Sequence, residues 1–258
     1  MIRGLLSDVH GVLYTHPTVI PGSPEAVGRL REAGIPLLFL TNSTQYPKRH
    51  ILETLREGGF ALEPEMLLTA VEAAGEVMRE RGFRRVGWLC NPALQEDLPG
   101  FEVVDPGASG AVDAVLVGDL RDGFVYGVLN RGFRWLHDGA ALVALARNRF
   151  YQGPDGLMLD SGPFVRLLEE ATGVESVVTG KPSRTFFEAG LHRLGIPAAE
   201  AAMIGDDFEF DVLPAMELGM TGVLVRTGKY REGAYRAAGR EADRVEADLA
   251  AVAEWVLG

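Results

Sequence analysis

The sequence predicts an α/β protein with a doubly wound parallel-sheet core and an inserted, smaller α/β unit. Short apolar runs alternate with longer amphipathic stretches, which is typical of parallel strands connected by helices. Between residues 75 and 178 the alternation continues, but the connections become longer and richer in glycine. We therefore expect residues 1–74 and 179–258 to form the core and residues 75–178 to form the inserted unit.

Eight apolar runs predict the buried strands. In chain order they are "IRGLLSD", "IPLLFLTN", "EMLLTA", "RRVGWLC", "AVDAVLVG", "AALVALA", "AAMIGDD" and "MTGVLVR". Each run is short and rich in aliphatic residues, as expected for strands that are covered on both faces. The segments between most of these runs carry helical patterns.

Two segments illustrate the helical patterns between the strands. Residues 23–34 have Pro24 in a plausible first turn and Gly34 where a helix would stop. Residues 182–195 repeat apolar side chains at positions i, i+4 and i+7. At the end of the chain, residues 240–258 predict a short strand and then an amphipathic helix.

The segment "QGPDGLMLDSG", residues 152–162, is rich in glycine within the inserted unit. We predict that it forms a loop of that unit or the return of the chain to the core. If this segment takes part in substrate selection, Met158 and Asp160 are the side chains best suited to do so.

Composition narrows the class of protein. The 258 residues carry a formal net charge of −11, which disfavours nucleic acids and anionic membrane surfaces as partners. Cys90 is the only cysteine, so neither a disulfide within the chain nor a cysteine zinc cluster can form. The sequence shows no secretory signal, and its apolar runs are too short to cross a bilayer. We therefore expect a cytoplasmic protein.

Polar side chains gather where four of the predicted core segments end. In a doubly wound sheet these carboxyl ends meet at one edge, where ligands bind. Carboxylates that lie this close repel one another unless a cation joins them. An all-oxygen ligand set favours Mg²⁺, which proteins hold with a few carboxylates together with substrate phosphate oxygens. The residues at these ends are Asp8, His10 and Gly11; Thr41, Asn42 and Ser43; Lys181; and Asp206, Asp207 and Asp211.

This set fits phosphoryl transfer, which depends mainly on positioning and charge neutralisation. Thr41, Asn42 and Lys181 can surround phosphoryl oxygens, and the carboxylate of Asp8 can act as a nucleophile. Each motif alone also has an ordinary structural explanation, as a turn, a helix cap or an acidic helix start. Their joint occurrence, in this order and each after a buried strand, favours the catalytic interpretation.

The four motifs "DVHGVL", "LFLTNST", "GKPS" and "MIGDDFEFDV" resemble those of the haloacid dehalogenase-like phosphohydrolases. The inserted unit resembles the cap of their type IIA branch. The resemblance implies a Rossmann-like core and a magnesium-dependent hydrolase acting on a small phosphorylated substrate. It allows a homodimer joined through the caps, whereas the residues themselves leave the oligomeric state open.

The resemblance also assigns roles to individual residues. It implies that Asp8 is the nucleophile and that Thr41 and Asn42 hold the phosphoryl oxygens. Lys181 would neutralise the charge shared by Asp8 and the phosphate, and Asp207 fits the pattern less clearly. The implied metal ligands are Asp8, the backbone carbonyl of His10 and Asp206, with Asp211 orienting water at the metal or Lys181.

His10 departs from the family pattern, which usually has a second aspartate two residues after the nucleophile. That aspartate protonates the leaving group and then activates water. Imidazole can do both near neutral pH, so the ring of His10 is a candidate general acid and base. Alternatively the ring only packs beneath the cap and the residue contributes its backbone carbonyl. The second interpretation predicts a preference for good leaving groups such as pyrophosphate, aryl phosphate or N-linked phosphate.

Three other functions compete with a phosphohydrolase. A carbon–halogen hydrolase would need no metal, which would leave "GDDFEFD" without a purpose. A receiver-like regulator also uses Asp, Thr or Ser, and Lys, but it has no inserted cap. A phosphoryl-binding protein with weak or no turnover is harder to separate, because His10 replaces the usual acid/base residue.

Overall fold

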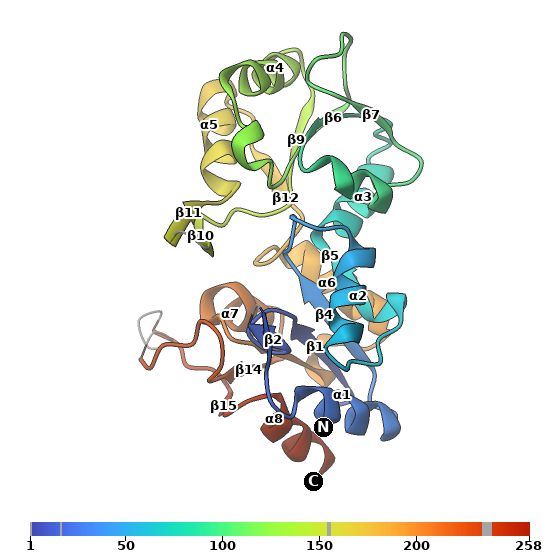
Figure 1. The fold of residues 1–258 in the computed structure, drawn as a ribbon, viewed down its shortest axis with the longest axis vertical. Coiled ribbons are helices and arrows are strands. Elements are labelled where there is room, and N and C mark those ends of the chain that lie inside the picture. The colour runs from blue at the N-terminus through green and yellow to red at the C-terminus, as the bar shows by residue number, and fades with distance from the viewer. Residues whose placement is uncertain (1, 16, 154–155, 234–238) are drawn as a thin grey trace. The chain divides into compact units, whose positions relative to one another are not determined.

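The computed structural model describes residues 2–15, 17–153, 156–233 and 239–258 (Figure 1). It divides into two compact units. The core unit comprises Met1–Thr41, Arg49–Leu68 and Lys181–Gly258, and the inserted unit comprises Asn42–Lys48 and Thr69–Gly180. Two compact units in one chain are what the change of texture along the sequence predicts. The domain boundaries at residues 74/75 and 178/179 remain a prediction.

The core unit is built on a six-stranded sheet whose strands follow the order β15-β14-β13-β1-β4-β5. β1 pairs in parallel with β13 on one side and with β4 on the other, and β13–β14 and β14–β15 are also parallel. Because parallel strands end at one edge of a sheet, the residues that follow them gather there and form the site described below. The six strands span Gly4–Asp8 (β1), Leu37–Thr41 (β4), Leu67–Thr69 (β5), Ala201–Gly205 (β13), Thr221–Val225 (β14) and Arg244–Glu246 (β15).

Helices cover both faces of the core sheet because its strands are apolar on both sides. Leu5 packs in a cluster with residues of α1 (Ser23–Glu32), α2 (Lys48–Glu57) and α8 (Leu249–Leu257). Leu6 points to the opposite face, where it lies close to Gly190 of α6 (Arg184–Leu194). The short helix α7 (Leu213–Glu217) contacts both α6 and β14. A small antiparallel pair, β2 (Tyr14–Thr15) and β3 (Thr18–Val19), follows β1.

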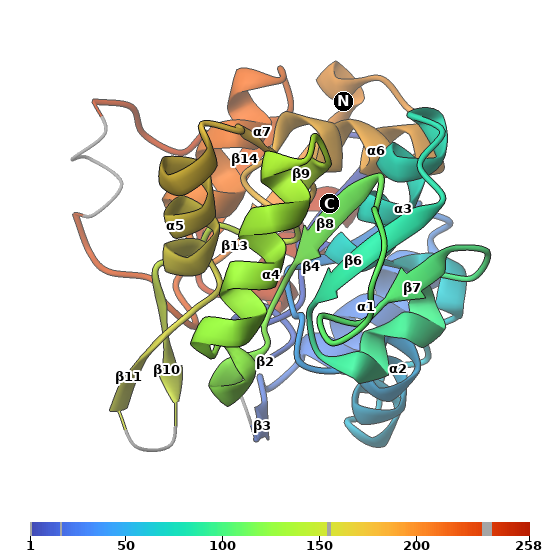
Figure 2. The same ribbon diagram turned by 90° about the horizontal axis from the view of Figure 1, so that it is seen from above.

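The inserted unit has a five-stranded parallel sheet of its own, in the order β12-β9-β8-β6-β7. Helix α3 (Ala70–Glu80) packs with one hydrophobic cluster of this unit, and helices α4 (Tyr126–His137) and α5 (Gly162–Thr172) pack with another. Figure 2 shows α4 and α5 side by side. The five strands span Arg85–Leu89 (β6), Glu102–Val104 (β7), Ala114–Val117 (β8), Ala141–Ala144 (β9) and Ser176–Val178 (β12).

The remaining helical elements are short. Four are 3₁₀ turns, and η5 is a π-helical turn that carries part of the site. They span Pro64–Met66 (η1), Pro92–Asp97 (η2), Arg121–Gly123 (η3), Ala198–Glu200 (η4) and Phe208–Val212 (η5). No helix within the described ranges combines the length and the apolar character that crossing a membrane requires.

The eight strands predicted from apolar runs are confirmed, as are the helices at residues 23–34 and 182–195 and the final strand and helix. The loop predicted for residues 152–162 is wrong. β10 (Phe150–Gly153) and β11 (Gly156–Leu159) pair antiparallel, with Phe150 opposite Leu159; Pro154 and Asp155 lie outside the described residues. Aromatic and long apolar side chains favour a pleated pair here, and the glycines at its end obscured that pattern.

Candidate active site

The candidate site lies where the order of the core strands reverses direction. From β1 the chain proceeds to β4 on one side, and after the inserted unit it returns to β13 on the other. Ligands of open α/β sheets bind at such a switch point, outside the carboxyl ends of the strands. Asp8 is the last residue of β1, and Asp206 directly follows β13. The sheet therefore brings two carboxylates that are distant in sequence to neighbouring strand ends.

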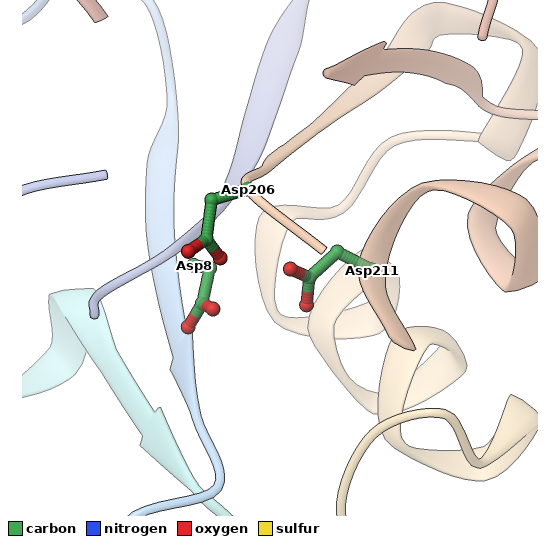
Figure 3. Close-up of side chains that lie close together, drawn as sticks. All are labelled: Asp8, Asp206 and Asp211. Atoms are coloured by element: carbon green, nitrogen blue, oxygen red, sulfur yellow. The ribbon is translucent and has the colours of Figure 1, made fainter. Parts of the chain in front are cut away.

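Three carboxylates converge at this point (Figure 3). Asp8, Asp206 and Asp211 each offer an oxygen atom, and these three atoms all lie within 4.8 Å of one another. Asp206 and Asp211 are 2 % and 1 % exposed, and the side chain of Asp8 is 13 % exposed. Three acidic groups this close and this buried require positive charge nearby.

Lys181 supplies part of that charge. Its Nζ lies 2.6 Å from Oδ1 of Asp8 and 2.8 Å from Oδ1 of Asp211, and its side chain is 4 % exposed. Burial alone would lower the pKa of Lys181, but the charges of Asp211 and Asp8 outweigh burial and raise it. Lys181 therefore stays an ammonium ion between two of the three carboxylates.

Asp206 is held by the backbone around it. The N–H of Lys229 donates to Oδ2 of Asp206 at 2.7 Å. Gly11 and Gly228 both approach this carboxylate so closely that a Cβ on either would lie 1.9 Å from Oδ2. Both glycines have positive φ, +86° and +56°, a conformation that L side chains rarely adopt. These positions therefore require glycine for two reasons, conformation and space.

Asp211 is placed by the π-helical turn η5. Asp207 is the N-cap of this turn, and its Oδ1 accepts from the N–H groups of Glu209 and Phe210, both at 3.2 Å. The N–H of Asp207 in turn donates to Oδ2 of Asp211 at 3.2 Å. π-helical turns occur often at functional sites, where the extra residue re-aims a side chain. Asp207 thus has a structural role next to the cluster.

The donor set fits a hard divalent cation. Oδ1 of Asp206 is buried and has no hydrogen-bond partner among the described residues. Burial, and then the charge of Asp8, raise the pKa of Asp206 to about 6, and burial raises the pKa of Asp211 well above its usual range. A cation among these oxygens would satisfy the unpartnered atom and offset the repulsion. Carboxylate oxygens are the ligands that Mg²⁺ prefers.

The second predicted motif is divided between the units. Thr41 ends β4 in the core unit and is 4 % exposed; its neighbour Leu40 lies opposite Asp8 in the sheet register. Asn42 belongs to the inserted unit, where a Cβ on Gly180 would lie 2.5 Å from its Oδ1. The structure thus brings Thr41 to the strand next to Asp8, while the contact predicted between Asn42 and a phosphoryl group remains a prediction.

His10 is exposed, and its ring meets Tyr14 edge to face with 5.6 Å between the ring centroids. His10 and Tyr14 also form an isolated β-bridge across the turn that follows β1. Burial, and then the charge of Asp8, raise the pKa of Tyr14. Both roles considered for His10 remain predictions.

Sequence reasoning missed the loop after β14. Thr227, Gly228 and Lys229 pack against the cluster, and Nζ of Lys229 lies 3.3 Å from Oδ2 of Asp207. Beside them lies a pocket of about 130 Å³, lined by Asp206, Asp207, Phe208, Glu209, Leu224, Lys229, Tyr230 and Arg231. The signal was present: "TGKY" directly follows the predicted strand "MTGVLVR", and lysine occurs only three times in the chain.

Comparisons with known proteins identify the family of this chain. Residues 5–103 match a family model described as haloacid dehalogenase-like hydrolase, and residues 178–252 match a second model described as HAD-hydrolase-like. The chain is 40% identical over 231 residues to haloacid dehalogenase-like hydrolase domain-containing protein 2 of Rattus norvegicus, covering 90% of this chain and 86% of that protein. The chain belongs to the haloacid dehalogenase-like hydrolases, as its four motifs predict.

Other relatives and similar structures indicate which branch of the family the chain belongs to. The phospholysine phosphohistidine inorganic pyrophosphate phosphatase of Xenopus laevis is 38% identical over 237 residues, covering 89% of this chain and 85% of that protein. The structure of a p-nitrophenyl phosphatase from Archaeoglobus fulgidus superposes with a TM-score of 0.90 at 28% identity, covering 98% and 99% of the two chains. The inserted unit, with its parallel five-stranded sheet, is the cap of the type IIA branch.

Proposed function

We propose that this hydrolase is a magnesium-dependent phosphatase that acts on a small phosphorylated substrate, with Asp8 as the nucleophile. The observation that carries the proposal is the position of Asp8. It stands at the end of β1, 2.6 Å from Nζ of Lys181 and beside the carboxylates of Asp206 and Asp211. A carboxylate nucleophile needs this kind of surrounding, because attack on a phosphate brings two anionic groups together.

The proposed reaction has two steps. A carboxylate oxygen of Asp8 attacks phosphorus, the bond from phosphorus to the leaving group breaks, and an aspartyl phosphate forms. Water then attacks this intermediate, releases inorganic phosphate and restores the carboxylate of Asp8. Lys181 offsets the charge that Asp8 and the phosphoryl group share, and Thr41 and Asn42 hold phosphoryl oxygens. The backbone N–H of Val9 donates to Oδ1 of Asp8 at 2.6 Å and fixes the carboxylate in place.

A bound Mg²⁺ would lower the electrostatic barrier to the approach of the anionic substrate. The residues that we propose to hold it are Asp8, Asp206, the backbone carbonyl of His10 and, through water or Lys181, Asp211. The three carboxylates outnumber the one buried ammonium group among them. This excess of negative charge supports a cation as part of the working site.

The names of relatives support the choice of reaction. One relative is named a phosphatase of phospholysine, phosphohistidine and inorganic pyrophosphate, and two similar structures are named p-nitrophenyl or 4-nitrophenyl phosphatases. These names share a phosphoryl group on a leaving group that departs readily. We propose the same preference for this chain, because His10 stands where the family usually has an acidic proton donor.

A phosphoryl-binding protein with little turnover is the second candidate, and the replacement at His10 is the observation that favours it. The two candidates differ in the time course of phosphate release. An enzyme releases phosphate steadily over many turnovers, whereas a protein that stops at the aspartyl phosphate releases only the leaving group, once per chain.

The test compares the unaltered protein with Asp8→Asn on p-nitrophenyl phosphate, with and without Mg²⁺. We expect steady phosphate release that requires Mg²⁺, and a loss of at least ~10³-fold in kcat for Asp8→Asn, because the nucleophile is gone. Asp105→Asn is the matched control, since this exposed aspartate lies outside the cluster.

Turnover by Asp8→Asn at the rate of the unaltered protein would show that Asp8 is not the nucleophile. A single burst of p-nitrophenol without continued phosphate release would favour the binding protein.

A further inference from the structure

The loop Thr227–Lys229, which we call the clamp loop, closes over one side of the acidic cluster. It follows β14, the strand beside β13, and it reaches back to the turn after β1. Thr227 donates its hydroxyl to the backbone carbonyl of Gly11. A Cβ on Gly228 would lie 2.6 Å from the Cα of Gly11, so the two backbones are in direct contact. The clamp loop thus joins the two strand ends that carry Asp8 and Asp206.

We propose that the clamp loop is a positioning device that presents a single oxygen of Asp206 to the catalytic cation. The N–H of Lys229 occupies Oδ2 of Asp206 at 2.7 Å, and the Cα groups of Gly11 and Gly228 enclose the same oxygen. Oδ1 is left buried, with no hydrogen-bond partner among the described residues. The proposal rests on the proposed function, since it concerns the metal site of that reaction.

The clamp loop is also linked to the third carboxylate, Asp211, through Asp207. Nζ of Lys229 lies 3.3 Å from Oδ2 of Asp207. Asp207 caps the turn η5, and its N–H donates to Oδ2 of Asp211. One lysine therefore contacts Asp206 through its backbone and the neighbour of Asp211 through its side chain. Mutation of groups that orient metal ligands in this way typically weakens metal binding ~10- to 100-fold.

The first test uses glycine-to-alanine substitutions with matched strain. In Gly228→Ala the new Cβ must displace the carboxylate of Asp206, because it would lie 1.9 Å from Oδ2. Gly195→Ala is the control: its φ is +68°, close to the +56° of Gly228, but nothing lies within 4 Å of the new Cβ. Both substitutions place a side chain at a positive φ, so the difference between them reports mainly the crowding at Asp206 and Gly11.

The readout is the dissociation constant of Mg²⁺ alone, measured from the rise in unfolding temperature with Mg²⁺ concentration. We expect Gly228→Ala to bind Mg²⁺ ~10- to 100-fold more weakly than Gly195→Ala. Equal affinities for Mg²⁺ in the two variants would show that the clamp loop does not position Asp206 for the cation. No Mg²⁺-dependent rise in the unaltered protein would overturn the clamp and the proposed metal site together, whereas Mg²⁺ binding without phosphate release would count against the proposed function only.

A second pair of variants avoids any change in the backbone. Thr227→Val removes the hydroxyl that bonds to Gly11 and keeps the shape of the side chain, and Thr227→Ser keeps the hydroxyl. We expect weaker Mg²⁺ binding in Thr227→Val and recovery in Thr227→Ser. The same Mg²⁺ affinity in both would show that the hydroxyl does not hold the clamp loop in place.

Discussion

The two oxygens of Asp206 have different surroundings, and this difference is the central feature of the site at the scale of single residues. One oxygen is enclosed by backbone, and the other is buried without a partner among the described residues. An unpartnered buried carboxylate oxygen is costly, so a protein keeps one only where something else satisfies it. The proposed cation would satisfy this oxygen. Burial and the nearby charge of Asp8 raise the pKa of Asp206 to about 6, and a cation would offset both effects.

His10 gives the prediction that belongs to this scale. Because its ring is exposed and rests against Tyr14, we propose that the residue serves through its backbone carbonyl. The unaltered protein should then hydrolyse p-nitrophenyl phosphate faster than an alkyl phosphate such as glycerol phosphate. His10→Ala should lower kcat less than tenfold on either substrate, since a general acid contributes ~10²-fold or more.

The pair of substrates makes this prediction decisive. A loss of ~10²-fold or more that is confined to the alkyl phosphate would identify the ring of His10 as the proton donor. Equal turnover of the two substrates by the unaltered protein would contradict the preference for good leaving groups.

Some site residues could be predicted from sequence and others could not. Asp8 and Asp206 lie at the carboxyl ends of β1 and β13, and the parallel sheet gathers such ends at one edge, so their proximity follows from pattern alone. Lys181 lies instead on the segment that leads from the inserted unit into α6, so its contact with Asp8 is a finding of the structure. The part played by Gly228 could not be predicted, because it is an approach of backbone to a carboxylate, and Lys229 acts there through its N–H. Every residue except proline has a backbone N–H, so a donor of this kind cannot be identified from the residue type.

At the scale of elements, the start of helix α3 shows how local chemistry fixes a boundary. Thr69 accepts from the N–H of Glu72, and Glu72 accepts from the N–H of Thr69, both at 3.1 Å, so the two residues form a capping box. Glu72 also pairs with Lys48 at 2.8 Å. The same carboxylate therefore joins the start of α3 to the start of α2.

We expect Thr69→Ala to lower the free energy of unfolding by ~1 kcal/mol, because it leaves the N–H of Glu72 without its acceptor. Ser183→Ala is the matched control, since Ser183 is the N-cap of α6 but makes no capping hydrogen bond through its side chain. Urea unfolding followed by circular dichroism measures both. Equal losses in the two variants would show that the cap of α3 contributes no more than an unbonded one.

The elements that sequence could not foresee are those without a periodic pattern. β10 and β11 are four residues each, and their glycine-rich ends predict a loop. The π-helical turn η5 is likewise invisible in sequence, because Asp211 is compatible with the first turn of an ordinary helix. Helix α6 was predictable because its apolar positions repeat over several turns, and α1 because Pro24 and Gly34 mark its two ends.

At the scale of the whole molecule, the two units have separate hydrophobic cores, and only one of them carries the acidic cluster. The cluster that contains Leu5 belongs to the core unit, whereas Trp88 and Trp135 lie in two clusters of the inserted unit. All the carboxylates of the site come from the core unit. A cation that binds them stabilises that unit directly.

The three tryptophans allow the stabilisation of each unit by Mg²⁺ to be measured separately. Trp255 lies in the core unit, under the guanidinium of Arg244, and the other two lie in the inserted unit. In Trp88→Phe/Trp135→Phe, Mg²⁺ at about 100 times its dissociation constant should raise the stability reported by Trp255 fluorescence by about 2.7 kcal/mol. In Trp255→Phe the remaining tryptophans should report less than half of this gain. Equal gains would show that the units unfold together.

The core unit is assembled from three separate stretches of chain, whereas most of the inserted unit is one continuous stretch. A ribosome makes the chain from its N-terminus, so Thr69–Gly180 has been synthesised completely while β1 still lacks its neighbour β13. Almost two hundred residues are added after Asp8, the proposed nucleophile, before Asp206 is synthesised. Until then the chain cannot build the acidic pocket, and catalytic competence is among the last properties that the newborn protein acquires.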